Sequence, residues 1–219
     1  MRLKNYLTEG PQYRYDPPTL RGILEKECKT MLKMYLSRKP LLWRGTLKAG
    51  GQTWIEKKSH LEKGRKPVDT PQWIHNELNK MLKQKFGWPV RDGIPATISQ
   101  KQAEYYGGGK AHVFFPTDPF KYAYFSEASD YYMWFSEIIQ TTEHWFEAVV
   151  PLGSTNNPSE KGKEYIIEIL ESSIKDFHNS NYEKAVGEIF FNSKKYYLVD
   201  HWLLTVDLYP DVNFYSRYA

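Results

Sequence analysis

The stretch GEIFFNSKKYYLVD, residues 187–200, restricts the fold more than any other part of the chain. Two apolar runs flank a short polar segment, and this pattern predicts a β-hairpin whose strands belong to the core. Glu188 stands at the start of the first run, beside Gly187 and directly before Ile189. A carboxylate is costly to bury, so its place at the mouth of a core strand raises the question of what it does there.

The composition is that of a globular protein with a core of its own. The chain has 219 residues, of which 41% are hydrophobic and 26% charged, and this length fits one domain or one domain with an appendage. Aromatic residues make up 16%, including 17 Tyr and 7 Trp. Such side chains suit ligand pockets, interfaces and base stacking, and they equally suit an ordinary core.

Charge and cysteine content limit the partners and the compartment. The formal net charge of +4 is mildly basic and does not by itself require a nucleic-acid partner. The single cysteine, Cys28, excludes an internal disulfide, and the simplest expectation is a cytoplasmic protein. No stretch is apolar enough to span a membrane, residues 1–10 lack the apolar core of a signal peptide, and no Cys/His cluster has metal-ligand spacing. We therefore expect no membrane partner and no metal.

The pattern along the chain predicts an α+β protein. Periodic apolar residues predict one helix over 19–37, capped by Thr19, and a second over 70–87, with Thr70 as its cap, Pro71 at its first position and Gly87 at its end. Further helices are expected from Glu127 onward and over 159–180. Strands are expected at 41–43, at the start of 93–109 (running into helical turns), at 111–116, at the start of 120–139 and at 201–210, whereas 46–70 reads as loop. We expect an N-terminal extension and helix, 1–38, packed on a domain formed by 39–219.

A basic segment lies inside the predicted loop. The sequence KKSHLEKGRKP, 57–67, contains five of the chain's basic residues, and four of them are the candidate contacts Lys57, Lys58, Lys63 and Arg65. A flexible loop of this kind is either simply solvated or contacts the phosphates of a nucleic acid or another acceptor.

Three polar residues stand at predicted strand ends, in a fixed order along the chain. Arg44 follows a buried strand, Ser99 ends the segment ATIS, and Glu188 opens a late strand. Each has an ordinary explanation when taken alone: a salt-bridge partner, a helix N-cap and an exposed acid.

Together these segments resemble the ADP-ribosyltransferases of the arginine–serine–glutamate class. The matching segments are LLWRG, ATISQKQAEYYG and EIFFNSKKYYLVD, which fall in the family's order over about residues 40–200. The second match is partial, because Ala96 stands where the family's motif has its first Ser. The resemblance implies a split β-sheet core with flanking helices, and NAD as the substrate.

The resemblance also implies a role for each residue. Glu188 would stabilise the positive charge that develops on the ribose when nicotinamide leaves, and would hold the ribose 2′-hydroxyl. Arg44 would contact the phosphate or ribose side of NAD, Ser99 would brace Glu188, and Gly45 would let the backbone approach the nicotinamide amide. Candidates for stacking on the nicotinamide ring are Tyr105, Tyr106 and Phe125. His75 is either a further NAD or acceptor contact or an ordinary helix-surface histidine.

The residue two positions before Glu188 bears on which acceptor the enzyme modifies. Family members that modify arginine carry a second acid two residues before the catalytic Glu, and here that residue is Val186. The expectation is therefore a mono-ADP-ribosyltransferase, a glycosyltransferase acting on a protein or nucleic acid but not on arginine. The small, single-domain layout suggests a phage-encoded member that acts in the host cytoplasm. The alternative is an inactive relative that serves as a nucleic-acid-binding or virion-associated module.

Overall fold

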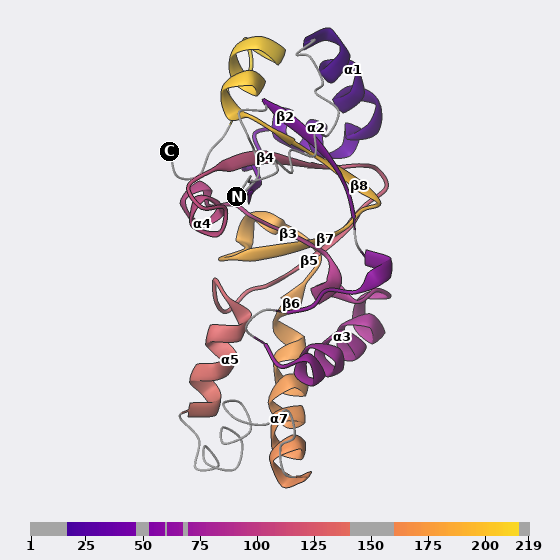
Figure 1. The fold of residues 1–219 in the computed structure, drawn as a ribbon, viewed down its shortest axis with the longest axis vertical. Coiled ribbons are helices and arrows are strands. Elements are labelled where there is room, and N and C mark those ends of the chain that lie inside the picture. Colours follow the sequence, from indigo (N-terminus) through magenta and orange to yellow (C-terminus); the bar gives the residue numbers. More distant parts are fainter. Residues whose placement is uncertain (1–16, 47–52, 60, 68–69, 141–159, 215–219) are drawn as a thin grey trace, which may run out of the picture.

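A computed structural model describes residues 17–46, 53–59, 61–67, 70–140 and 160–214. The described chain combines helices with one antiparallel sheet, which confirms the α+β class (Figure 1). The helices are α1 (Pro17–Glu27), α2 (Lys29–Leu36), α3 (Gln72–Phe86), α4 (Gln100–Tyr106), α5 (Tyr131–Gln140) and α7 (Glu160–Ser173). The strands are β1 (Trp43–Gly45), β2 (Trp54–Lys58), β3 (Ile94–Thr97), β4 (Ala111–Pro116), β5 (Lys121–Phe125), β6 (Phe177–His178), β7 (Glu188–Asn192) and β8 (Lys195–Val199).

The sheet is nearly divided in the middle. Its strand order is β2-β8-β4-β1-β3-β7-β5-β6, and every pairing is antiparallel. The central strands β1 and β3 pair only at Trp43 and Thr97, whereas the neighbouring pairs β1–β4 and β3–β7 are longer. The strands from β2 to β1 and those from β3 to β6 therefore form two half-sheets joined at one point.

Each half-sheet has its own helical cover. Helices α1 and α2 lie with β2, β4 and β8 at one end of the molecule, and α3, α5 and α7 lie at the other (Figure 1). Successive side chains of β7 point to opposite faces of the sheet and therefore pack into two different cores. Ile189 and Phe191 belong to the cluster that contains α1 and α2, and Phe190 belongs to the cluster of α3, α5 and α7. A strand buried on both faces explains the uninterrupted apolar run in the sequence.

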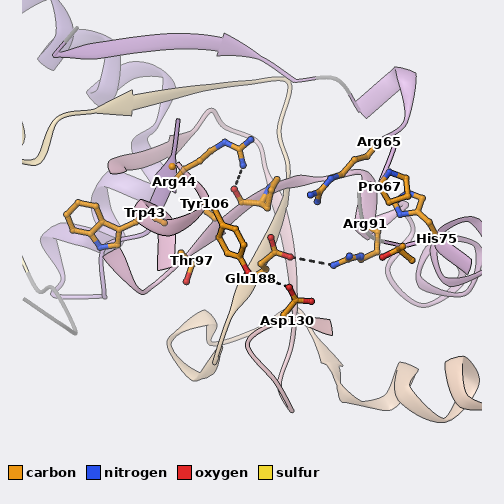
Figure 2. Close-up of a pocket in the computed structure, with 15 residues that line it drawn as sticks. Trp43, Arg44, Arg65, Pro67, His75, Arg91, Thr97, Tyr106, Asp130 and Glu188 are labelled. Carbon is orange, nitrogen blue, oxygen red and sulfur yellow. Dashed lines mark hydrogen bonds and ion pairs between the residues drawn. The ribbon is translucent and has the colours of Figure 1, made fainter. Parts of the chain in front are cut away.

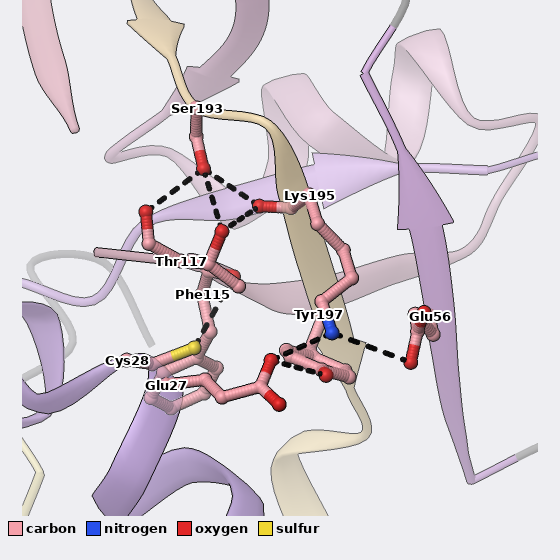
Figure 3. Close-up of polar contacts among 8 residues, drawn as sticks. All are labelled: Glu27, Cys28, Glu56, Phe115, Thr117, Ser193, Lys195 and Tyr197. Carbon is pink, nitrogen blue, oxygen red and sulfur yellow. Dashed lines mark hydrogen bonds and ion pairs between the residues drawn. The ribbon is translucent and has the colours of Figure 1, made fainter. Parts of the chain in front are cut away.

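The predicted hairpin at 187–200 is wrong. Strands β7 and β8 follow one another in sequence, but β7 pairs with β3 and β5, and β8 pairs with β2 and β4. The chain crosses between the half-sheets at Ser193, whose buried hydroxyl lies 2.9 Å from the carbonyl oxygen of Thr117 and 2.6 Å from that of Lys195 (Figure 3). Both are interior strands whose two edges are already paired with other strands, so neither edge is free for the partner that the hairpin prediction assumed.

Polar contacts fasten α1 to β8 and to the sheet edge (Figure 3). Lys195 Nζ lies 2.6 Å from Glu27 Oε2 and 3.8 Å from Glu56 Oε2, and the Tyr197 hydroxyl donates to Glu27 over 2.8 Å. The hydrogen bond from Lys195 holds the pKa of the Glu27 carboxyl below its usual value. Cys28 is buried, as expected for a core residue, and burial raises the pKa of its thiol.

Four further expectations need correction. The N-terminal helix is broken at Cys28 and already begins before Thr19, so Thr19 is not its cap. Helix α3 begins at Gln72 after Pro71, which makes no side-chain cap, although the left-handed Gly87 ends the helix as predicted. Residues 54–58 form the edge strand β2, and residues 203–208 form a π-helix rather than a strand.

The reasons lie in the partners of these segments. Strand β2 is a polar edge strand, in which Trp54 is buried and Glu56 and Lys58 are exposed, so its sequence resembles a loop. In the C-terminal segment the buried residues Leu203, Leu204 and Leu208 recur at helical spacing.

Candidate functional site

A pocket of about 370 Å³ opens where β1 and β3 part. Strands from both half-sheets, α4 and the loops before and after α3 contribute to its wall (Figure 2). This volume is within the range of small-molecule sites. The lining residues are Trp43, Arg44, Gly45, Arg65, Pro67, Thr70, His75, Arg91, Pro95, Ala96, Thr97, Ala103, Tyr106, Asp130 and Glu188.

Glu188 lies in this pocket at the first position of β7, opposite Thr97 of β3. Its side chain is 20% exposed, and its Oε2 atom lies 3.6 Å from Nη1 of Arg91. The preceding Gly187 packs its backbone directly on Ser129, since a Cβ at Gly187 would lie 2.0 Å from the Ser129 carbonyl oxygen. This close approach brings the start of α5, and with it Asp130, beside Glu188.

Arg44 reaches the same pocket from β1. Its Nη1 atom donates to the carbonyl oxygen of Pro95 on β3, across the gap between the half-sheets (Figure 2). The guanidinium also lies over the ring of Tyr196, 5.6 Å from its centroid. Because one side of the Arg44 guanidinium is occupied by this hydrogen bond, its other N–H donors remain available for an anionic or carbonyl ligand.

Ser99 does not line the pocket and instead caps α4. Its hydroxyl accepts the backbone N–H of Gln102 at 3.2 Å, which is the ordinary explanation for a serine at this position. Thr97 takes the place in the pocket that the sequence had suggested for Ser99. Its hydroxyl donates to Gln102 Oε1 at 2.7 Å and accepts the backbone N–H of Ser99 at 3.2 Å. The polar hydroxyl opposite Glu188 therefore belongs to Thr97.

Gly45 has a structural role that explains why no larger residue stands there. A Cβ on Gly45 would lie 2.1 Å from the carbonyl oxygen of Ala103, and one on Gly107 would lie 2.5 Å from the Cα of Gly45. Helix α4 and strand β1 thus meet backbone to backbone. This contact sets the wall of the pocket that carries Ala103 and Tyr106.

The three candidate stacking residues lie in three different environments: the pocket wall, the protein surface and the core. Tyr106 lines the pocket, and its hydroxyl donates to Asp130 Oδ2 at 3.4 Å. Tyr105 is 85% exposed and is absent from the pocket wall. Phe125 is buried in the second core, where its ring lies 4.8 Å from that of Trp134. Of these three candidates, Tyr106 is the one that lines the pocket and could stack on a ligand there.

His75 is buried in the pocket wall, so it is not a helix-surface histidine. Its Nε2 atom lies 2.8 Å from Asp92 Oδ1 and 3.1 Å from Asn79 Nδ2, and its buried Nδ1 has no hydrogen-bond partner among the described residues. Burial lowers the pKa of His75, and the bond to Asp92 opposes that shift. The neutral ring with one open nitrogen can exchange a hydrogen bond with a ligand hydroxyl or amide.

Two further arginines line the pocket, and the sequence had singled out only one of them. Arg65 leaves the basic segment and points into the pocket, and Arg91 comes from the turn before β3 (Figure 2). Arg91 is buried against the face of Phe190, 4.7 Å from the ring centroid. Burial lowers the pKa of Arg91, and the negative charge of Glu188 opposes this effect.

The basic segment is not the flexible loop that its composition suggested. Lys57 and Lys58 lie on strand β2 opposite Tyr196 and Lys195, and Lys63 ends a short 3-10 helix. These three lysines are absent from the pocket wall, whereas Arg65 forms part of it. Pairing of 54–58 with β8 fixes the first two lysines at the sheet edge, so only Arg65 of the four predicted contacts belongs to the pocket.

The residues that sequence reasoning missed are Thr97, Arg91 and Asp130. Thr97 lies two positions before Ser99, so the alternation of a strand carried the information. Arg91 had a detectable signal as well, being a charged residue between the apolar Trp88–Val90 and Ile94. Asp130 had none, because only the packing of Ser129 on Gly187 brings it to the pocket.

Two kinds of site are absent from the described part of the chain. No group of three or more His, Cys, Asp or Glu residues is placed to hold a metal ion there. Nor does any helix within the described ranges have the length and apolar character needed to cross a membrane. Comparison with protein-family profiles, curated proteins and solved structures gives no match to this chain.

Proposed function

We propose that this protein is an NAD-dependent mono-ADP-ribosyltransferase. The observation that carries the proposal is that Arg44, Thr97 and Glu188, from three different strands, line one pocket at the division of the sheet. The near division into two half-sheets also supports the split-sheet architecture that the resemblance implies. No homologue contributes to this proposal.

The reaction needs few groups. The bond between the ribose anomeric carbon and the nicotinamide nitrogen breaks, and nicotinamide leaves as a neutral molecule with the bonding electron pair. A nucleophile of the acceptor then bonds to the anomeric carbon and releases its proton. Positive charge develops on the ribose in between, and a fixed carboxylate in a largely desolvated site stabilises that charge.

The pocket provides these groups on rigid elements. Glu188 is the carboxylate, held at the mouth of β7 by pairing with Thr97 of β3, while β5 pairs with β7 from the next residue onward. Thr97 stands opposite it and is oriented by Gln102, so its hydroxyl can contact the same ribose. Arg44 and His75 would bind other parts of NAD, and Tyr106 would stack on a planar ring.

The acceptor is proposed to be a protein or nucleic acid nucleophile other than arginine. Val186 is exposed two residues before Glu188, and an isopropyl group cannot activate a guanidinium. Such an acceptor would have to bring its own reactive nucleophile.

The test is transfer of label from NAD that carries radioactive phosphate in its adenylate part. Wild type, Glu188→Gln and the matched control Glu25→Gln are incubated with NAD and a cell lysate, with nuclease or protease added to parallel samples. We expect label in macromolecules with wild type and Glu25→Gln, reduced by about 100-fold or more in Glu188→Gln. Glu25 is an exposed acid of α1, so its substitution controls for a change of charge alone.

The outcomes separate the proposed function from its alternative. The added nuclease or protease identifies the class of acceptor, and nicotinamide release without label identifies NAD hydrolysis. Equal labelling by folded Glu188→Gln contradicts the proposed role of this residue. Failure of the wild type to label any macromolecule or release nicotinamide would favour a non-catalytic binding module.

A further inference from the structure

More arginines than acids line the pocket, because Glu188 and Asp130 are its acidic lining residues. Three of its lining residues are arginines, and Arg44 already donates to a backbone carbonyl. Arg65 and Arg91 each bury an Nη1 atom that has no hydrogen-bond partner among the described residues. A buried donor without a partner is costly in a folded protein, so two of them in one cavity indicate a ligand that accepts hydrogen bonds.

The charges of these two arginines reinforce that conclusion. A guanidinium stays protonated in proteins, and the charge of Arg65 lies close enough to Arg91 to contribute to lowering its pKa. Like charges in a desolvated pocket repel each other. Of the two arginines, Arg91 is the one that forms an ion pair with Glu188. The distance from Arg91 Nη1 to Glu188 Oε2 is 3.6 Å, which is longer than a hydrogen bond. The Nη1 atoms of both arginines therefore remain without a hydrogen bond from the described residues.

Two further acids lie nearby, Asp130 and Asp92. The negative charge of Asp130 acts on Arg91 together with that of Glu188. Asp92 uses one carboxylate oxygen, Oδ1, for both His75 Nε2 at 2.8 Å and the backbone N–H of Arg65 at 3.1 Å. The backbone contact holds the start of the Arg65 side chain at the pocket rim, while the guanidinium extends inward beside that of Arg91 (Figure 2). Asp92 therefore positions Arg65 through its backbone.

We infer that Arg65 and Arg91 form the binding subsite for the diphosphate of the dinucleotide substrate. This inference rests on the proposed function, and it assigns the phosphate contacts to residues outside the three resembling segments. Guanidinium forks match phosphate oxygens in both geometry and charge. A dianionic group would accept the two buried N–H donors and cancel the repulsion between them. It would also draw Arg91 away from Glu188, which would leave that carboxylate available for the ribose hydroxyls.

The experiment measures binding of two probes, ADP-ribose and inorganic pyrophosphate, by calorimetry. The variants are Arg65→Gln, Arg91→Gln and the control Arg21→Gln, which removes an equal charge from an exposed position on α1. We expect Arg65→Gln and Arg91→Gln to weaken both probes by about ten- to a hundredfold, the usual effect of losing a charge-assisted hydrogen bond. Arg21→Gln should bind both as the wild type does.

Several results would overturn the inference. These are wild-type protein that binds neither probe, Arg65→Gln that binds them as tightly as wild type, and Arg21→Gln that weakens them equally. Arg65→Gln keeps the backbone contact with Asp92, so it tests the inference even if the buried Arg91→Gln fails to fold. Turnover of NAD is measured separately. Arginine-dependent probe binding without turnover supports the subsite and contradicts the proposed activity, and turnover with arginine-independent binding does the reverse.

Discussion

The ion pair between Glu188 and Arg91 makes the candidate catalytic acid a contributor to stability as well. The two charged atoms are 3.6 Å apart, and their side chains are 20% and 10% exposed. At an effective dielectric constant near 20, Coulomb's law gives an attraction of about 4 to 5 kcal/mol at this distance. Dehydration of both groups offsets part of that attraction. We expect a net coupling of about 2 kcal/mol, within the range that contacting residues show.

A double-mutant cycle measures this coupling. Glu188→Gln, Arg91→Gln and the double variant are unfolded in urea, with tryptophan fluorescence as the signal. Each single variant should unfold at a midpoint about 1 M below that of the wild type, because each leaves one buried charge without its partner. The double variant should lose much less than the sum of the two single losses.

The control cycle uses Arg21 and Glu25, whose charged atoms are closer, at 2.9 Å, but whose side chains are half exposed. Solvent screens such a pair, so its coupling should stay within experimental error. If the Glu188–Arg91 coupling is no larger than that of the control pair, burial does not strengthen the ion pair. The electrostatic argument for the pocket would then be wrong.

Two further changes test the construction of the pocket. Gly187→Ala should sharply lower transfer activity and destabilise the fold, because its Cβ would lie 2.0 Å from the Ser129 carbonyl oxygen. The control Gly22→Ala should do neither, because there is open space around Gly22. Equal unfolding in urea and equal activity of the two variants would contradict the proposed contact of Gly187 with Ser129. Burial lowers the pKa of His75 and of His201, so the unfolded chain binds more protons below its histidine pKa of about 6.5. The free energy of unfolding should therefore be highest well above pH ~6.5 and should fall as the pH drops through that value. A free energy of unfolding that stays constant through this pH range would contradict the lowered histidine pKa values.

Much of the local structure follows from the sequence. Apolar runs at 111–116, 188–192 and 195–199 predicted strands, and the periodicity and final glycine of 70–87 predicted a helix. Apolar spacing reports which face of an element is buried, and this is a local property. The same reasoning placed Glu188 at the start of a strand, which is confirmed, and Arg44 just after one, although Arg44 lies within β1. Both residues line the pocket.

The partners of these strands were beyond the reach of sequence. Residues 187–200 read as a hairpin, yet the fold separates the two strands into different half-sheets. Strand β2 was missed because an edge strand needs few apolar residues, and its existence depends on β8. Strand pairing is a long-range choice, and apolar runs of similar composition do not specify it.

The residues of the candidate site can likewise be separated into those that the sequence predicted and those that only the tertiary structure brought together. The sequence by itself determined that an acid begins a core strand, because the order of apolar residues along the chain is a local property. It placed Arg44 just after a strand, whereas Arg44 is the middle residue of β1. Tertiary structure decided that Thr97 rather than Ser99 faces the acid, that Arg65 and Arg91 meet in one pocket, and that Phe125 belongs to the core. These choices depend on the near division of the sheet and on the contact of Gly187 with Ser129. Both result from packing between segments far apart in the chain.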